Sequence, residues 1–111
     1  MLPELDVARV RKWAHDHTPP EFRHEMLVEV EETARGLILH DARPPWDEKY
    51  GPEWIRTPFA RLLYVNKRRE WTLYWADRNS KFHRYELAAP TPHIGDILTE
   101  IDADPTNIFW G

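Results

Sequence analysis

The sequence predicts an α+β fold in which a five-stranded antiparallel meander sheet is flanked by an N-terminal and a C-terminal helix. Three observations lead to this fold. Apolar residues recur at helical spacing near both ends of the chain. Apolar and polar residues alternate through its middle, and the turns between the middle segments are too short for helical crossovers. Residues 1–111 are expected to form a single domain.

Residues 4–17 are the predicted N-terminal helix. The two prolines that follow shortly after end it, because proline lacks a backbone amide and restricts the residue before it. The apolar side chains of this segment share one stripe at the 3.6-residue spacing of a helix, so the stripe would pack on a sheet. They are Leu5, Val7, Val10, Trp13 and Ala14.

Two strands are predicted next, over residues 22–34 and 37–40. In the first, apolar residues alternate with glutamates, which is the pattern of a half-buried strand with an acidic outer face. Gly36 predicts the hairpin turn between the two strands, since glycine adopts turn conformations without steric cost.

The long segment 44–58 is predicted to be irregular, because it holds four prolines and a glycine. Its three large rings, Trp46, Tyr50 and Trp54, argue against a loop that moves freely in solvent. Two interpretations stay open. The rings pack down as a lid over one end of the core, or they form the walls of a ligand cleft.

Three further strands are predicted over residues 59–65, 71–76 and 81–87, joined by short polar turns. The prolines after the last strand break the chain, and a second helix opens at Thr91 or His93. Its apolar side chains again form one stripe. They are Ile94, Ile97, Leu98 and Ile101.

Composition predicts a core built from large rings. The chain has six tryptophans and only four glycines, so aromatic side chains would fill much of the interior. The last four residues, Ile108-Phe109-Trp110-Gly111, form a ring cluster of their own. We therefore expect the C-terminus to be tied into the core rather than frayed.

The same composition excludes several classes of protein. There is no cysteine, so disulfides and thiolate metal sites are excluded. The first residues have neither the basic start nor the apolar segment of a signal peptide, and the longest apolar runs are too short to span a bilayer. The expectation is a cytoplasmic protein without membrane contact, and no motif implies a cofactor.

The hairpin of residues 71–85 is the best candidate for a binding surface, because it interleaves five aromatic residues with cations. It belongs to a wider basic segment. Residues 56–84 hold eight cations and two acids in a chain whose net charge is −4. This asymmetry indicates either two solvated faces of opposite charge or an electropositive patch that attracts an anionic partner.

Alternation along the last predicted strand suggests which residues of the hairpin share a face. If Phe82 joins Trp71 and Trp75 in the core, the opposite face carries rings and cations suited to single-stranded nucleic acid or another polyanion. The candidate ligand-binding residues are Tyr74, Arg78, Lys81, His83 and Tyr85.

Other functions are compatible with the same residues. An acidic protein partner could bind this face, or the arginines and tyrosines could simply cover a sheet face against a helix. A metal-independent ribonuclease would use His83 as general acid or base with Lys81 and Arg84 as cations. A homodimer could form through the loop that carries Trp46.

Six histidines raise the question of a metal site, but none of them is placed at ligand spacing. His15 and His17 are two residues apart on a predicted helix, which turns them away from one another. His40 precedes Asp41 at a strand end, where the carboxylate could orient the imidazole. No metal is therefore expected.

Short motifs from residue 56 onward resemble an uncharacterised bacterial family known as a domain of unknown function, numbered 3024. The similar segments are Ala60-Arg61 with Tyr64, the runs 71–75 and 81–85, and Asp104 with the terminal Phe-Trp-Gly. They cover about half of the chain. The resemblance implies no activity, but it implies that the hairpin and the terminal residues belong to one structural unit.

Overall fold

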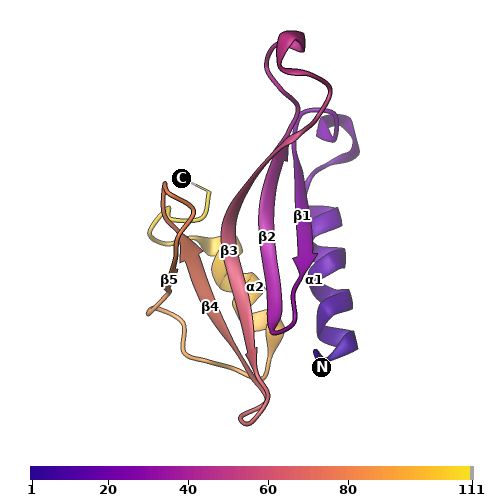
Figure 1. The fold of residues 1–111 in the computed structure, drawn as a ribbon. Coiled ribbons are helices and arrows are strands. Elements are labelled where there is room, and N and C mark those ends of the chain that lie inside the picture. The colour runs from indigo at the N-terminus through magenta and orange to yellow at the C-terminus, as the bar shows by residue number, and fades with distance from the viewer. Residues whose placement is uncertain (111) are drawn as a thin grey trace.

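In the computed structural model, five strands and two α-helices follow one another in the predicted order (Figure 1). The structure describes residues 1–110, and Gly111 of the expected terminal cluster lies outside them. The elements are α1 (Glu4–His17), β1 (Leu27–Glu32), β2 (Gly36–Arg43), β3 (Ile55–Val65), β4 (Glu70–Ala76), β5 (Phe82–Arg84) and α2 (Ile94–Ala103). The α+β class and the antiparallel meander are confirmed.

The sheet has the order β1-β2-β3-β4-β5, and both helices lie on one side of it (Figure 1). Leu37, Leu62 and Leu73 are paired across three neighbouring strands, so they share the face that the helices cover. The register shifts once, beside His40, where Phe59 is the extra residue of β3. A bulge of this kind bends its strand and re-aims the side chains beyond it.

The core lies between the sheet and the two helices. Trp71 in β4 is fully buried, and its indole N–H donates to Asp6 of α1 at 2.8 Å. Trp13 of α1 donates in the same way to Asp102 of α2 at 3.1 Å. Trp71 is fully buried and Trp13 is half-buried, and the one polar atom of each ring is satisfied. The first bond holds α1 against the sheet, and the second joins α1 to α2.

Gly36 is required by the close approach of two strands rather than by a left-handed turn. A Cβ atom built on Gly36 would lie 2.0 Å from the carbonyl oxygen of Leu62. The preceding turn is closed by Thr33, whose amide donates to the Gly36 carbonyl at 2.8 Å. Any side chain at this position would therefore push β2 away from β3.

The C-terminal segment is tied into the core, as the sequence predicts. Phe109 is 7% exposed, and its ring lies 5.1 Å from the ring of Tyr85. The buried carboxylate of Asp104 accepts hydrogen bonds from the backbone amides of three residues after α2. These are Ile108 at 2.8 Å, Phe109 at 3.1 Å and Trp110 at 2.8 Å.

The predicted boundaries of four strands are wrong. β1 begins at Leu27 rather than at residue 22, because Pro20–Phe22 form a 3₁₀ turn. β2 continues to Arg43 rather than ending at residue 40. β3 begins at Ile55, inside the segment predicted to be irregular. Its proline, Pro58, is tolerated within the strand because it lies beside the bulge, where the hydrogen-bond ladder is already interrupted. β5 ends at Arg84.

Residues 41–57, here called the arm, are the ends of β2 and β3 with their connection, and they extend beyond the rest of the molecule (Figure 1). Trp46 is 79% exposed and Tyr50 is 57% exposed, whereas Trp54 is half-buried. The lid interpretation is therefore wrong. The arm carries Trp46 and Tyr50 away from the core. Their ring centroids lie 5.3 Å apart, so the two rings contact each other instead.

Candidate functional site

The face of the sheet turned away from both helices, here called the helix-free face, is the candidate site. Strand alternation divides its side chains into two halves of different character. Glutamates and a histidine lie on β1 and β2, whereas arginines and rings lie on β3, β4 and β5. The two halves differ in whether their charges are already paired.

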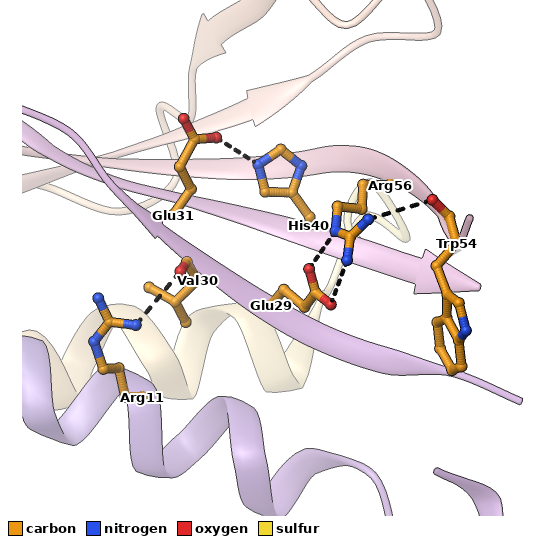
Figure 2. Close-up of polar contacts among 7 residues, drawn as sticks. All are labelled: Arg11, Glu29, Val30, Glu31, His40, Trp54 and Arg56. Atoms are coloured by element: carbon orange, nitrogen blue, oxygen red, sulfur yellow. Dashed lines mark hydrogen bonds and ion pairs between the residues drawn. The ribbon is translucent and has the colours of Figure 1, made fainter. Parts of the chain in front are cut away.

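The β1–β2 half is acidic, and its charges are offset by neighbours within the face (Figure 2). The His40 ring lies 2.8 Å from the Glu31 carboxylate. Arg56 forms an ion pair with Glu29 and also donates to the Trp54 carbonyl at 3.3 Å, and the Glu29 carboxylate raises the pKa of Arg56. This half therefore offers few free charges to a ligand.

Four side chains of the β3–β5 half form the basic-aromatic face, as it is called here. They are Arg61, Tyr74, Phe82 and Arg84. The Arg61 guanidinium carbon lies 6.0 Å from the Tyr74 ring centroid and 5.9 Å from the Phe82 ring centroid. Arg84 pairs with Tyr74 in the ladder, so it extends the same surface. Both distances are within cation–π range, which holds the cation between two rings.

Within residues 1–110, neither arginine of the basic-aromatic face forms an ion pair. The one acid on this half, Glu70, begins β4 and pairs with Val65 rather than with Arg61. The Arg61 Nε atom is buried and has no hydrogen-bond partner among residues 1–110, which is uncommon for a buried donor.

Such an arrangement suits flat, anionic ligands. Exposed ring faces stack on bases, and a guanidinium donates two parallel hydrogen bonds to a phosphate. Because the rings and the cations project from a rigid sheet, the surface is ordered before any ligand arrives.

The expected grouping of Tyr74 with His83 and Tyr85 on one face is wrong. The ladder pairs Ala76 with Phe82, which places Phe82 beside Tyr74 on the helix-free face. The core position that Phe82 was expected to fill belongs to Tyr85, which is 3% exposed and donates to Glu100 at 2.9 Å. Burial, together with this hydrogen bond, raises the pKa of Tyr85 to about 12.

His83 lies on the opposite side of β5 from Arg84, next to Trp75, so the three residues of the ribonuclease hypothesis do not share a face. Its Nε2 atom lies 2.7 Å from the Asp77 carboxylate. The hydrogen bond with His83, then that with the Lys81 amide, lowers the pKa of Asp77 to about 2. The pair fixes the orientation of the imidazole. The same carboxylate accepts hydrogen bonds from the Asn79 and Lys81 amides, which closes the turn that carries Arg78.

A cleft of about 530 Å³ lies at the base of the arm, between the β4–β5 turn and the C-terminal segment. Trp46 and Arg78 both line this cleft, so two of the candidate residues lie close together. Their position does not test whether either of them contacts a ligand. Tyr50 and Trp54 are not among its lining residues. Its floor includes Phe59 and Phe109, both of which are buried.

Residues 1–110 lack two further kinds of feature. In the part of the chain that the structure describes, no group of three or more histidine, aspartate or glutamate side chains could hold a metal ion. Across the same residues, neither helix has the length and apolar character to cross a bilayer.

The family model described as Domain of unknown function (DUF3024) matches residues 2–111. The chain belongs to this family. The match confirms the resemblance and extends it from scattered motifs to nearly the whole chain. No curated protein and no solved structure matches the chain.

The sequence reasoning missed Arg61 and Phe82, although a signal for one of them was present. Arg61 lies between Ala60 and Leu62 in a predicted strand, so alternation alone places it opposite the core side chains. The face on which Phe82 lies depends on the register between β4 and β5. The sequence does not determine this register, because the predicted strand carries two rings, Phe82 and Tyr85, that could each fill the core position.

Proposed function

We propose that this DUF3024 domain is a cytoplasmic binding module whose basic-aromatic face takes single-stranded nucleic acid. One observation carries the proposal. Arg61 is held between Tyr74 and Phe82 on a sheet face without helices, and it has no carboxylate partner among the described residues. A cation that is ordered but unpaired is suited to a phosphate from outside the chain.

The chemistry of the face favours a single strand over a duplex. Rings on an antiparallel sheet stack on bases only when the bases are free of their own partners. Arg84 is exposed beside Tyr74, so a phosphate that follows a stacked base would meet a second cation. The rest of the chain is acidic, which would confine a polyanion to this half of the face.

The test is a titration of a labelled oligothymidylate of about 12 nucleotides, within the roughly 4–16 that comparable domains cover. Wild-type protein should bind, and the affinity should fall as salt rises, because phosphate contacts release counterions. Arg84→Gln should weaken binding and lower the salt slope by about 1, as loss of one phosphate contact does.

Two more variants make the test specific. Tyr74→Leu keeps an apolar side chain but removes a stacking ring, so affinity should fall by about 1–3 kcal/mol. Arg68→Gln is the matched control, because Arg68 is exposed in the β3–β4 turn and lies outside the basic-aromatic face. Absence of binding at low salt, or equal losses from Arg68→Gln and Arg84→Gln, would disprove the proposal.

A second candidate function is self-association through the arm. Trp46, Tyr50 and Ile55 are 79%, 57% and 55% exposed, and clustered exposed apolar groups often mark an interface. Light scattering over a range of protein concentrations would measure the mass. A dimer that Tyr50→Ser converts to a monomer would support this candidate, and a monomer at all concentrations would exclude it.

A further inference from the structure

The cleft at the base of the arm presents one ordered, exposed ring. Trp46 lines the cleft, whereas the Tyr50 ring, 5.3 Å away, and the Lys49 ammonium, 5.7 Å from the indole centroid, contact Trp46 without lining it. Neighbours outside the cleft thus support the indole, and it remains 79% exposed. A tryptophan held in this way offers a stacking surface at little entropic cost.

Among the described residues 1–110, the charges at the cleft leave one cation, Arg78, without an ion pair. The Asp41 carboxylate is paired with Arg43, whose Nε lies 2.9 Å from it. The Asp77 carboxylate accepts from the Asn79 and Lys81 amides and contacts His83.

Arg78, in contrast, lines the cleft and makes no ion pair with any residue in the described range 1–110. An anion that enters the cleft would therefore meet Arg78 rather than an unpaired carboxylate.

The cleft lies at the end of β4, at the boundary between the two faces of the sheet. Most strand residues that line it belong to the face that the helices cover, because Asp41 pairs with Thr57 and Arg43 pairs with Ile55. Two other lining residues come from the helix-free face. Pro58 pairs with His40, and Ala76 pairs with Phe82, so both residues belong to that face. Both also line the cleft. A chain that lies across the basic-aromatic face would therefore reach the cleft by passing around the end of β4, from one face of the sheet to the other.

We propose that the cleft takes one unstacked base of the bound single strand, stacked on Trp46, with an adjoining phosphate at Arg78. This inference rests on the proposed function and adds a second, separate contact to it. The volume of about 530 Å³ falls within the roughly 300–1,000 Å³ of pockets that hold small ligands. Phe59 and Phe109 supply an apolar floor beneath the base.

The experiment follows tryptophan fluorescence and affinity during titration with the same oligothymidylate. Stacking on Trp46 should quench part of the emission, and the quench should vanish in Trp46→Ala. That variant should bind about tenfold more weakly, as the loss of one stacked base does. Trp46→Phe should recover part of the affinity, and Arg78→Gln should lower the salt dependence.

Phe22→Ala is the matched control, because Phe22 is 50% exposed but does not line the cleft. If the oligonucleotide binds in an Arg84-dependent manner while Trp46→Ala binds normally, the cleft inference is wrong and the proposed function survives. If wild-type protein does not bind the oligonucleotide, both fail. If light scattering shows that Trp46→Ala dissociates a dimer, the cleft assignment is overturned in favour of self-association.

Discussion

The C-terminal segment and the arm both carry large aromatic rings, yet these rings differ in burial. Phe109 is 7% exposed, whereas Trp46 is 79% exposed. The difference lies in how each segment is anchored. Three backbone amides of the C-terminal segment bind one buried carboxylate, Asp104, directly after α2. The arm is held by the β2–β3 ladder, which directs its connection away from the core.

The comparison shows that ring content alone does not decide burial. A ring is buried when the backbone that carries it is brought to the core, and this requires a local anchor. Asp104 supplies one at the end of α2, where it adopts a left-handed conformation with φ of 40°. Aspartate tolerates this region better than most residues.

Deletion of residues 108–111 should have the largest effect on stability. The deletion removes Phe109 from the core, and loss of one buried Phe or Trp costs about 3–5 kcal/mol. That is a large share of the roughly 5–15 kcal/mol that stabilise a small domain. Thermal unfolding followed by circular dichroism should show a sharp fall in Tm. An unchanged Tm would mean that the segment only covers the surface.

Asp104→Ala should have the next largest effect, because it leaves three amides without their acceptor. Hydrogen bonds to charged groups contribute about 1.5–3 kcal/mol each, so the free energy of unfolding should fall by at least about 2 kcal/mol. Asp104→Asn is the control, since it keeps one acceptor oxygen and tolerates the left-handed backbone. Urea unfolding would rank the three proteins. Equal losses for both variants would mean that one acceptor oxygen is not enough and that both carboxylate oxygens are needed. An Asp104→Ala protein as stable as wild type would contradict the anchor.

The sequence was sufficient for the architecture because each element has its own local signal. The first helix was predicted with its observed bounds, since periodicity and the following prolines agree. The five strands and their order were also predicted, because short turns leave one topology. The start of β3 was predicted too late because Pro58 was expected to precede the strand. The sequence does not reveal the bulge beside which this proline is accommodated.

The candidate site was harder to predict because it depends on the register between β4 and β5. It also depends on which of two rings fills one position in the core. Phe82 and Tyr85 are both apolar rings near β5, and only one of them can occupy the core position beside Phe109. Tyr85 is favoured because Glu100 satisfies its hydroxyl. That contact lies between distant parts of the sequence, so alternation alone could not choose between the two rings.

The same contact provides a smaller effect that depends on pH. The pKa of Tyr85 is about 12 in the folded protein, above the ordinary value of 10.0, so folding favours the protonated phenol. This contribution to stability is fully present below pH 10 and is lost as pH rises through about 12. Ultraviolet titration should show one late phenolate step that is absent in Tyr85→Phe. A late step that persists in the variant would contradict the assignment.

Substitutions on the arm should have the smallest effect on stability and so complete the comparison. Trp46 is exposed and contacts Tyr50 rather than the core, so Trp46→Ala should change the free energy of unfolding by no more than about 0.5 kcal/mol. Trp110→Ala is the matched control, since that ring is half-buried against Phe59 at 4.7 Å and donates to the Ile101 carbonyl. It should cost several times more in the same urea titration. Equal costs would show that the arm is anchored to the core as firmly as the C-terminal segment. In that case Trp46 would be a structural ring rather than a ring available to a ligand.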